Sequence, residues 1–322
     1  MKLQENFSQF VIKNINLNKT REELLNERKE TISRLIIDNN LFKDKFIELE
    51  GQGSYYNNTI IKPVDENQKY DVDILLKINY IDEWEAKDYI DNIYKIFREN
   101  GNYKNINRKG GKCLVIEYAD NFNIDVTPLV KDIDNQYKVA DRNKNGLEPS
   151  NPQELNDFIK NKNTLSNGKL VEVIKLIKYI KREKMTFSLP STLMYVLLGN
   201  LTKENAFLEY IDLPTAFHTY INDLSDFLTK NEKQPEVLFP GNDFEEDLMK
   251  SLTEEQYENL RKVIKNICEI YNEGYNSIDR NESIEKYRCI FGNKFPDKIE
   301  ELNKIENFLT SNNSNRPFGG IE

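Results

Sequence analysis

The sequence of 322 residues is poor in the side chains that build disulfide frameworks, zinc clusters and histidine-based active sites. Its three cysteines, Cys113, Cys268 and Cys289, are odd in number and widely spaced. They match neither a disulfide framework nor a zinc cluster, and we expect them to be reduced and dispensable. The only histidine, His218, has no second ligand or nucleophile nearby in the sequence. We therefore expect it to be packed rather than catalytic.

Long apolar runs and an excess of positive charge are also missing. No segment approaches the roughly 20 apolar residues of a membrane span, and the first residues lack the apolar core of a signal peptide. The net charge of −9 provides no basic field for holding duplex DNA or a membrane surface. These absences favour a cytoplasmic protein that acts on small substrates, with no stable DNA binding and no membrane association.

Two aspartates stand two residues apart in a predicted β-strand. Residues 70–78 are mostly apolar and β-branched, so Asp71 and Asp73 should project from one face of this strand. Two carboxylates about 4 Å apart repel by roughly 4 kcal/mol at an effective dielectric constant of about 20. A cation between them would offset this repulsion. Mg²⁺ is the natural candidate, because it binds one or two carboxylates together with substrate phosphates.

A third aspartate repeats this pattern on a second predicted strand. Residues 113–118 and 122–127 look like two strands joined by a short turn. Within the second strand, Asp125 alternates with apolar neighbours, so its carboxylate should lie on a polar face. If this strand lies beside the first, the three acids suit a two-metal centre for phosphoryl transfer, with ions roughly 3.5 to 4 Å apart.

Three motifs together carry a resemblance to a known family: Gly53-Ser54, Asp71-Val-Asp73 and Asp125. In this order they resemble the nucleotidyltransferase superfamily of the DNA polymerase β type. The longer connector between the first two motifs resembles, more narrowly, the bacterial cGAS/DncV-like nucleotidyltransferases, which are second-messenger synthases of antiphage defence. The resemblance implies that the three aspartates are catalytic and bind two Mg²⁺ ions, for which Mn²⁺ can substitute.

The resemblance also implies a set of nucleotide-binding residues: Gln52, Gly53, Ser54, Lys178 and Ser191. Gly53 would allow close backbone approach, and Ser54 would hold the outer phosphates. Lys178 matches the family lysine that reaches the donor triphosphate, and Ser191 matches the serine that opens the next helix. A lysine supplies charge, and a hydroxyl at a helix start donates beside the helix N-terminus. A solvated lysine and a serine that only caps its helix remain open alternatives.

The expected fold is a two-lobed α+β nucleotidyltransferase of the polymerase β-like kind, with a mixed catalytic sheet and an N-terminal spine helix. The catalytic lobe, including the spine, would span residues 1–150. Residues 151–309 would form a helical lobe that completes the nucleotide cleft, and residues 310–322 a flexible tail. Residues 287–296 resemble the closing element of the family, whose aromatic side chains should dock the last helix on the core.

The expected reaction joins ribonucleoside triphosphates into a cyclic di- or trinucleotide second messenger and releases pyrophosphate. By resemblance, the product would act on a separate effector protein in antiphage (CBASS-type) defence. One alternative is a template-independent polymerase or an oligoadenylate-synthase-like enzyme with linear products, and the acidic net charge weakens its RNA-bound form. The other alternative is a catalytically silent nucleotide-binding sensor, against which the presence of all three acids argues.

Overall fold

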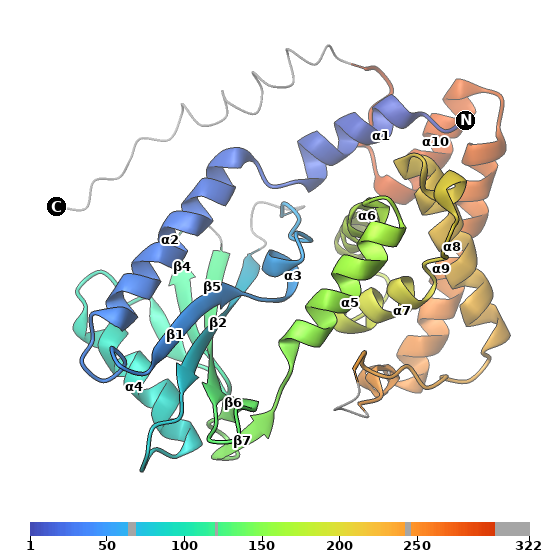
Figure 1. Cartoon of the computed structure of the whole chain (residues 1–322). Helices are drawn as coiled ribbons and strands as arrows, with labels where there is room; N and C mark the ends of the chain where they lie inside the picture. The colour runs from blue at the N-terminus through green and yellow to red at the C-terminus, as the bar shows by residue number, and fades with distance from the viewer. Residues whose placement is uncertain (64–68, 120–121, 242–245, 300–322) are drawn as a thin grey trace. The chain divides into compact units, whose positions relative to one another are not determined.

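The computed structural model of the protein describes residues 1–63, 69–119, 122–241 and 246–299. The chain folds into two compact units (Figure 1). The sheet unit comprises residues 21–156, and the helical unit comprises residues 1–20 together with the chain from residue 157. The tail predicted at residues 310–322 lies outside the described residues.

The sheet unit is built on a mixed β-sheet. Its strands run in the order β1 (Phe46–Gly51), β2 (Tyr70–Asn79), β5 (Phe122–Lys131), β4 (Leu114–Tyr118) and β3 (Asn107–Lys109), while β6 (Tyr137–Asp141) pairs with β5 and β7 (Gly146–Pro149) pairs with β6. Strands β2 and β5 are parallel, and the other pairs are antiparallel. The mixed sheet is confirmed, and the three strands predicted around the aspartates correspond to β2, β4 and β5.

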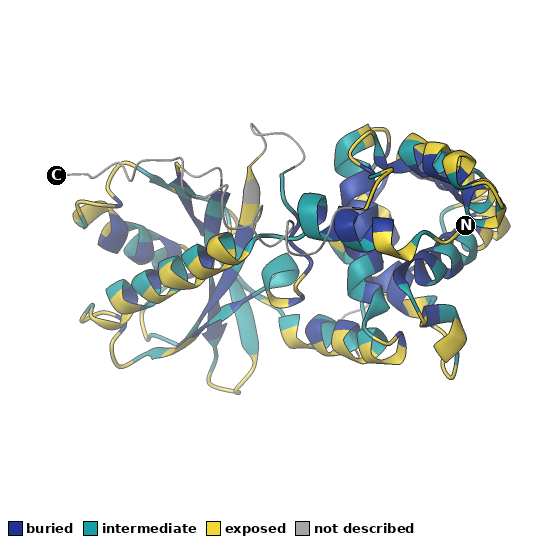
Figure 2. Cartoon of the chain, turned by 90° about the horizontal axis from the view of Figure 1, so that it is seen from above, coloured by how far each residue is buried: buried dark blue, intermediate teal, exposed yellow. Residues whose placement is uncertain are grey.

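Apolar and polar residues alternate along the first half of β5, so that one face of the strand is buried and the other is polar. Phe122, Ile124 and Val126 are buried, whereas Asn123 and Asp125 between them are partly exposed. Two helices bury apolar side chains in this unit: α2 (Lys19–Ile37), which is the predicted spine helix, and α4 (Ala86–Glu99). Buried residues gather inside each unit (Figure 2), so each unit has a core of its own.

The helical unit consists of helices and short helical turns. They are α1 (Gln4–Phe10), the π-helical turn η1 (Val11–Ile15), α5 (Pro152–Leu165), α6 (Lys169–Lys184), α7 (Ser191–Asn200), the 3₁₀ turn η2 (Phe207–Tyr210), α8 (Leu213–Lys230), the 3₁₀ turn η3 (Leu248–Ser251), α9 (Glu254–Asn276) and α10 (Arg280–Phe291). His218 stacks on Tyr275 with ring centroids 4.2 Å apart, and burial lowers its pKa. No helix in the described ranges is both long and apolar enough to span a membrane.

The first 20 residues fold with the helical unit, although the sequence analysis assigns them to the catalytic lobe. Their aromatic side chains explain the difference. Phe7 is fully buried and meets Tyr287 and Phe295 edge to face, with ring centroids 5.1 and 5.0 Å away. Phe10 packs on Phe291 of α10, with centroids 5.4 Å apart. The aromatic side chains of residues 287–296 thus anchor the last helix on the core, as predicted, and anchor the N-terminal helix as well.

Candidate active site

Four polar side chains stand together on β2 and β5. The two strands are parallel and in register, so that Asp71 lies beside Asn123 and Asp73 lies beside Asp125. Residues two apart on a strand share one face, and register partners on neighbouring strands share it too. The sheet therefore brings all three predicted carboxylates to one polar face. Asn123, which the sequence analysis did not select, completes the set and donates from Nδ2 to Asp71 Oδ1 at 3.0 Å.

The carboxylate of Asp125 lies in an unfavourable electrostatic environment. Burial raises its pKa above the ordinary aspartate value, and the negative charge of Asp71 raises it further. Its Oδ1 atom is buried and has no hydrogen-bond partner in the part of the chain that the structure describes. Oδ1 of the neighbouring Asn123 is also buried and has no hydrogen-bond partner among the described residues. A buried acceptor without a donor costs free energy, so this face would gain from a positively charged ligand.

Cys113 lies beside the same carboxylate. Its Sγ atom is 3.6 Å from Asp125 Oδ2. Burial first, and then the charge of Asp125, raise the pKa of this thiol to about 12, so it is protonated and able to donate at neutral pH. The sequence analysis treated this cysteine as dispensable. A signal was nevertheless present, because in a hairpin of residues 113–118 and 122–127 position 113 falls diagonally across from Asp125.

A glycine turn follows β1 and meets β2. The backbone N–H of Gln52 donates to the carbonyl of Asp73 at 2.8 Å. The next residue, Gly53, has φ +56° and begins the short helix α3 (Gly53–Tyr56). A Cβ atom on Gly53 would lie 3.2 Å from Asp73 Oδ2. Position 53 therefore requires glycine for two reasons: the backbone has a positive φ, and it approaches a carboxylate closely. Ser54 follows in α3, beside the same carboxylate-bearing strand.

A buried asparagine pair supports this turn. Asn57 Nδ2 donates to the carbonyl of Gly53 at 2.9 Å and to Asn156 Oδ1 at 3.0 Å. Asn57 and Asn156 are 8% and 3% exposed, so their hydrogen bonds form away from water and hold their partners firmly. Neither residue was selected from the sequence, where nothing distinguishes them from the many surface asparagines.

The predicted phosphate ligands of the second half of the chain lie in the helical unit. Lys178 on α6 is 9% exposed, and its Nζ donates to the hydroxyl of Tyr195 on α7 at 2.8 Å. It is not the solvated surface lysine of the alternative interpretation. Ser191 is exposed and is the first helical residue of α7, after the N-cap Pro190. The position of Ser191 at a helix start agrees with the prediction.

The polar face can be tested for its fit to a divalent cation. Among the described residues, no three or more His, Cys, Asp or Glu side chains are already gathered closely enough to hold a metal ion. The carboxylates of Asp71, Asp73 and Asp125 are nevertheless the oxygen ligands that Mg²⁺ prefers. Asp125 Oδ1 has no hydrogen-bond partner among the residues that the structure describes, so this oxygen is available to a ligand on that face. The chemistry of these donors is therefore that of a Mg²⁺ or Mn²⁺ site, although the described carboxylates are not gathered around one.

Comparison with known proteins agrees with this geometry. Residues 1–163 match the family described as the Second Messenger Oligonucleotide or Dinucleotide Synthetase domain. A c-di-GMP synthase from Roseivirga ehrenbergii is 29% identical over 114 residues, which are 35% of this chain and 30% of that protein. The chain thus matches less than a third of the length of this curated relative.

Solved structures match over nearly the whole chain. Vibrio cholerae DncV, a cyclic AMP-GMP synthase solved with the linear intermediate pppA(3′,5′)pG, superposes with a TM-score of 0.72 at 14% identity, over 91% of this chain and 96% of that one. The Bradyrhizobium diazoefficiens CD-NTase CdnG, solved with GTP, superposes with a TM-score of 0.69 at 14% identity, over 95% of this chain and 97% of that one. Escherichia coli CdnC in its HORMA-deltaN complex superposes with a TM-score of 0.69 at 13% identity, over 91% of this chain and 98% of that one. At these identities the matches establish the fold, which is the predicted one.

Proposed function

The chain belongs to the family of second messenger oligonucleotide or dinucleotide synthetases, and we propose that it is a Mg²⁺-dependent nucleotidyltransferase that makes a cyclic di- or trinucleotide. The observation that carries the proposal is the pairing of Asp71 and Asp73 with Asn123 and Asp125 on two parallel strands. This pairing places three carboxylates on one face, with a buried oxygen that lacks a donor within the described residues.

Each carboxylate has a distinct task in this proposal. Asp71 and Asp73 would hold the two cations, and Asp125 would be a further ligand of the ion next to the acceptor hydroxyl. When bound, the ions supply positive charge to the triphosphate and lower the pKa of the attacking hydroxyl. Asn123 orients Asp71 through its 3.0 Å hydrogen bond. The residues of this face thereby hold the acceptor oxygen and the donor phosphate in line for displacement of pyrophosphate.

The turn at Gly53 supplies the phosphate contacts. Without a Cβ atom, Gly53 leaves the space beside Asp73 open to a phosphate oxygen. Ser54 offers its hydroxyl and backbone amide to the outer phosphates, and Gln52 keeps the turn on β2 through its 2.8 Å bond to Asp73. In the helical unit, Lys178 and Ser191 are proposed to add charge and a hydroxyl donor to the donor triphosphate.

The proposed product is a second messenger that acts on a separate effector protein in antiphage defence. The relative from Roseivirga ehrenbergii, a c-di-GMP synthase, supports a cyclic product. The net charge of −9 also favours small nucleotides over a nucleic-acid template. We propose a cytoplasmic location, where both nucleoside triphosphates and reduced thiols are found.

A single assay tests the reaction. The purified protein is incubated with the four labelled ribonucleoside triphosphates and Mg²⁺ or Mn²⁺, and the products are separated before and after phosphatase treatment. A product that resists phosphatase, formed while the triphosphate substrates release pyrophosphate, supports the proposal. A ladder of products that retain a 5′-triphosphate would replace it with a linear-oligomer synthase. Binding of triphosphates with no turnover in either metal would identify a silent sensor.

A further inference from the structure

The thiol of Cys113 reaches Asp125 because of the register between β4 and β5. Val115 on β4 is the register partner of Asp125, and Cys113 precedes Val115 by two residues. Residues two apart project to the same side of a strand, and diagonal neighbours across two strands can touch. Cys113 is the residue immediately before β4, and the distance of 3.6 Å from Sγ to Asp125 Oδ2 agrees with this diagonal position.

Two glycines build the turn that holds this thiol. The N–H of Gly110 donates to the carbonyl of Cys113 at 2.8 Å, and a Cβ atom on Gly110 would lie only 2.9 Å from Cys113 Sγ. The carbonyl of Gly111 accepts from the N–H of Arg142 at 2.7 Å. A Cβ atom on Gly111 would collide with the side chain of Asn143, 2.6 Å away. The turn is thus fixed against the β6–β7 connection, and the sulfur is confined beside Asp125.

The two oxygens of Asp125 differ in their surroundings. Oδ2 faces the thiol, whereas Oδ1 is buried with no hydrogen-bond partner among the residues described. On the basis of the proposed function, we propose that Cys113 is a positioning residue for Asp125. Its S–H donates to Oδ2 and fixes the carboxylate plane, so that Oδ1 is presented to a divalent cation. Outer partners that orient a metal-binding carboxylate in this way contribute to metal affinity.

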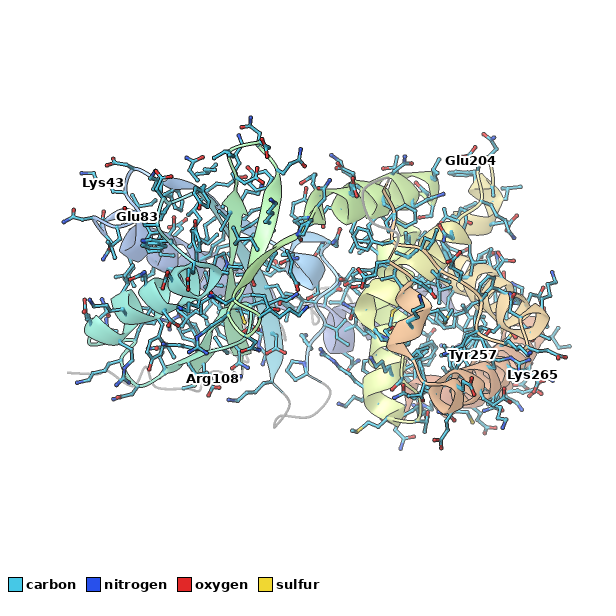
Figure 3. The ribbon with its side chains drawn as sticks, turned by 90° about the horizontal axis from the view of Figure 1, so that it is seen from below. Lys43, Glu83, Arg108, Glu204, Tyr257 and Lys265 are labelled. Carbon is cyan, nitrogen blue, oxygen red and sulfur yellow. The ribbon has the colours of Figure 1, made fainter. Side chains whose placement is uncertain are left out.

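A neutral donor suits this position. A lysine or arginine would neutralise Asp125 and compete with the cation for its charge, whereas a protonated thiol orients the carboxylate without doing so. The arginine of the neighbouring strand acts on Asp125 through its charge, which lowers the pKa of that carboxyl against the larger effect of burial, but its hydrogen bond is to another residue. Arg108 on β3 bonds Glu117 at 2.8 Å, and Figure 3 shows Arg108 at the margin of the sheet unit.

The test compares three single variants with the wild-type protein. Cys113→Ala removes the donor, Cys113→Ser restores a hydroxyl donor, and Cys289→Ala is the matched control at an exposed cysteine. Mn²⁺ binding is measured by titration without nucleotide, and the Mg²⁺ concentration for half-maximal product formation is measured separately. Melting temperatures identify variants that lose structure. Cys113→Val, which fills space without donating, replaces the alanine variant if that variant unfolds.

We expect Cys113→Ala to weaken Mn²⁺ binding by about threefold to tenfold, the range for loss of one hydrogen bond. The Mg²⁺ requirement should shift by the same factor, Cys113→Ser should recover part of the loss, and Cys289→Ala should behave as wild type. Unchanged Mn²⁺ binding in Cys113→Ala overturns the positioning role. Equal losses in the serine and alanine variants, in step with lower melting temperatures, would also overturn it.

The outcome separates this inference from the proposed reaction. A wild-type protein that makes product, with a Cys113→Ala variant of equal metal affinity, refutes only the role of the thiol. A wild-type protein that makes no product but binds Mn²⁺ more tightly than Cys113→Ala supports the role of the thiol and refutes the reaction. A wild-type protein that binds no Mn²⁺ refutes both.

Discussion

Asp73 on β2 and Asp125 on β5 are register partners on adjacent parallel strands, although α4, β3 and β4 come between them in the chain. A parallel pair needs such a crossover, and the connection here also contributes β3 and β4 to the sheet. The carboxylate pair therefore depends on long-range pairing of strands that are separated in the chain.

Replacing Asp71 and Asp73 together by Asn should leave a folded protein with turnover lowered at least about a hundredfold, because an amide cannot supply the anionic ligand that the cations need. Product formation and circular dichroism measure the two effects. The matched control is Asp134→Asn, an exposed aspartate outside this face, which should keep full activity. Normal turnover by the double variant would end the two-metal proposal.

Asp125→Asn should stabilise the metal-free protein at neutral pH and still abolish synthesis. The pKa of Asp125 is raised in the folded state by burial and by Asp71. Ionisation of this carboxyl therefore destabilises the fold. The resulting loss in the free energy of unfolding grows as pH rises from the unfolded-state pKa through the folded-state pKa. Asparagine does not ionise, so the variant is free of this destabilisation. Its melting temperature should exceed that of wild type at pH 7 with EDTA present, and the two melting temperatures should approach each other at acid pH.

The same Asp125→Asn variant should retain triphosphate binding, because the proposed task of Asp125 concerns the acceptor. Equilibrium binding of a non-hydrolysable triphosphate measures this. Complete loss of binding would place Asp125 on the donor side instead. A melting temperature below wild type at pH 7 would contradict the assigned environment of the carboxylate.

Gly53→Ala should lower both stability and turnover. A side chain at φ +56° costs about 1 to 2 kcal/mol, and the added Cβ atom, 3.2 Å from Asp73 Oδ2, should displace that carboxylate. Gly168→Ala is the matched control, since Gly168 also has a positive φ, +78°, but faces open space. Urea denaturation should show similar losses for both variants, whereas turnover should fall only for Gly53→Ala. Equal turnover in the two would show that the approach to Asp73 is unimportant.

Asn57 and Asn156 should be energetically coupled. Asn57→Ala removes the donor to Gly53 and Asn156 and leaves Asn156 Oδ1 without that donor, at a cost of about 1 to 3 kcal/mol. Denaturation of both single variants and of the double variant gives the coupling free energy, which we expect to be about 0.5 to 3 kcal/mol. Strictly additive losses would mean that the buried bond contributes nothing to the turn.

Lys178→Ala should weaken triphosphate binding by about 1.5 to 3 kcal/mol, the range for a charge-assisted contact. Because Lys178 is buried against Tyr195, the variant should also lose stability. Tyr195→Phe separates the two effects, since it removes the hydroxyl that accepts from Lys178 and keeps the lysine. If both variants lose only stability and bind triphosphate equally well, Lys178 is a packing residue.

Several features were predictable from the sequence because they depend on local periodicity. The apolar, β-branched run around Asp71 and Asp73 specifies a strand, and the two-residue spacing places both acids on one face. The same alternation around Asp125 predicted β5. The motif order from Gly53 to Asp125 was sufficient to predict the family, and with it the α+β fold that the structural comparisons confirm.

Other features required the tertiary structure because they depend on which distant segments pair. No local pattern assigns Asp73 the partner Asp125, buries Lys178 against Tyr195, or joins Asn57 to Asn156. The first 20 residues were misplaced for the same reason, since Phe7 is apolar in either lobe and only its aromatic partners on α10 decide between them. Strand and helix periods are set by the neighbouring residues in the chain, whereas register, burial and hydrogen-bond partners are set by long-range packing.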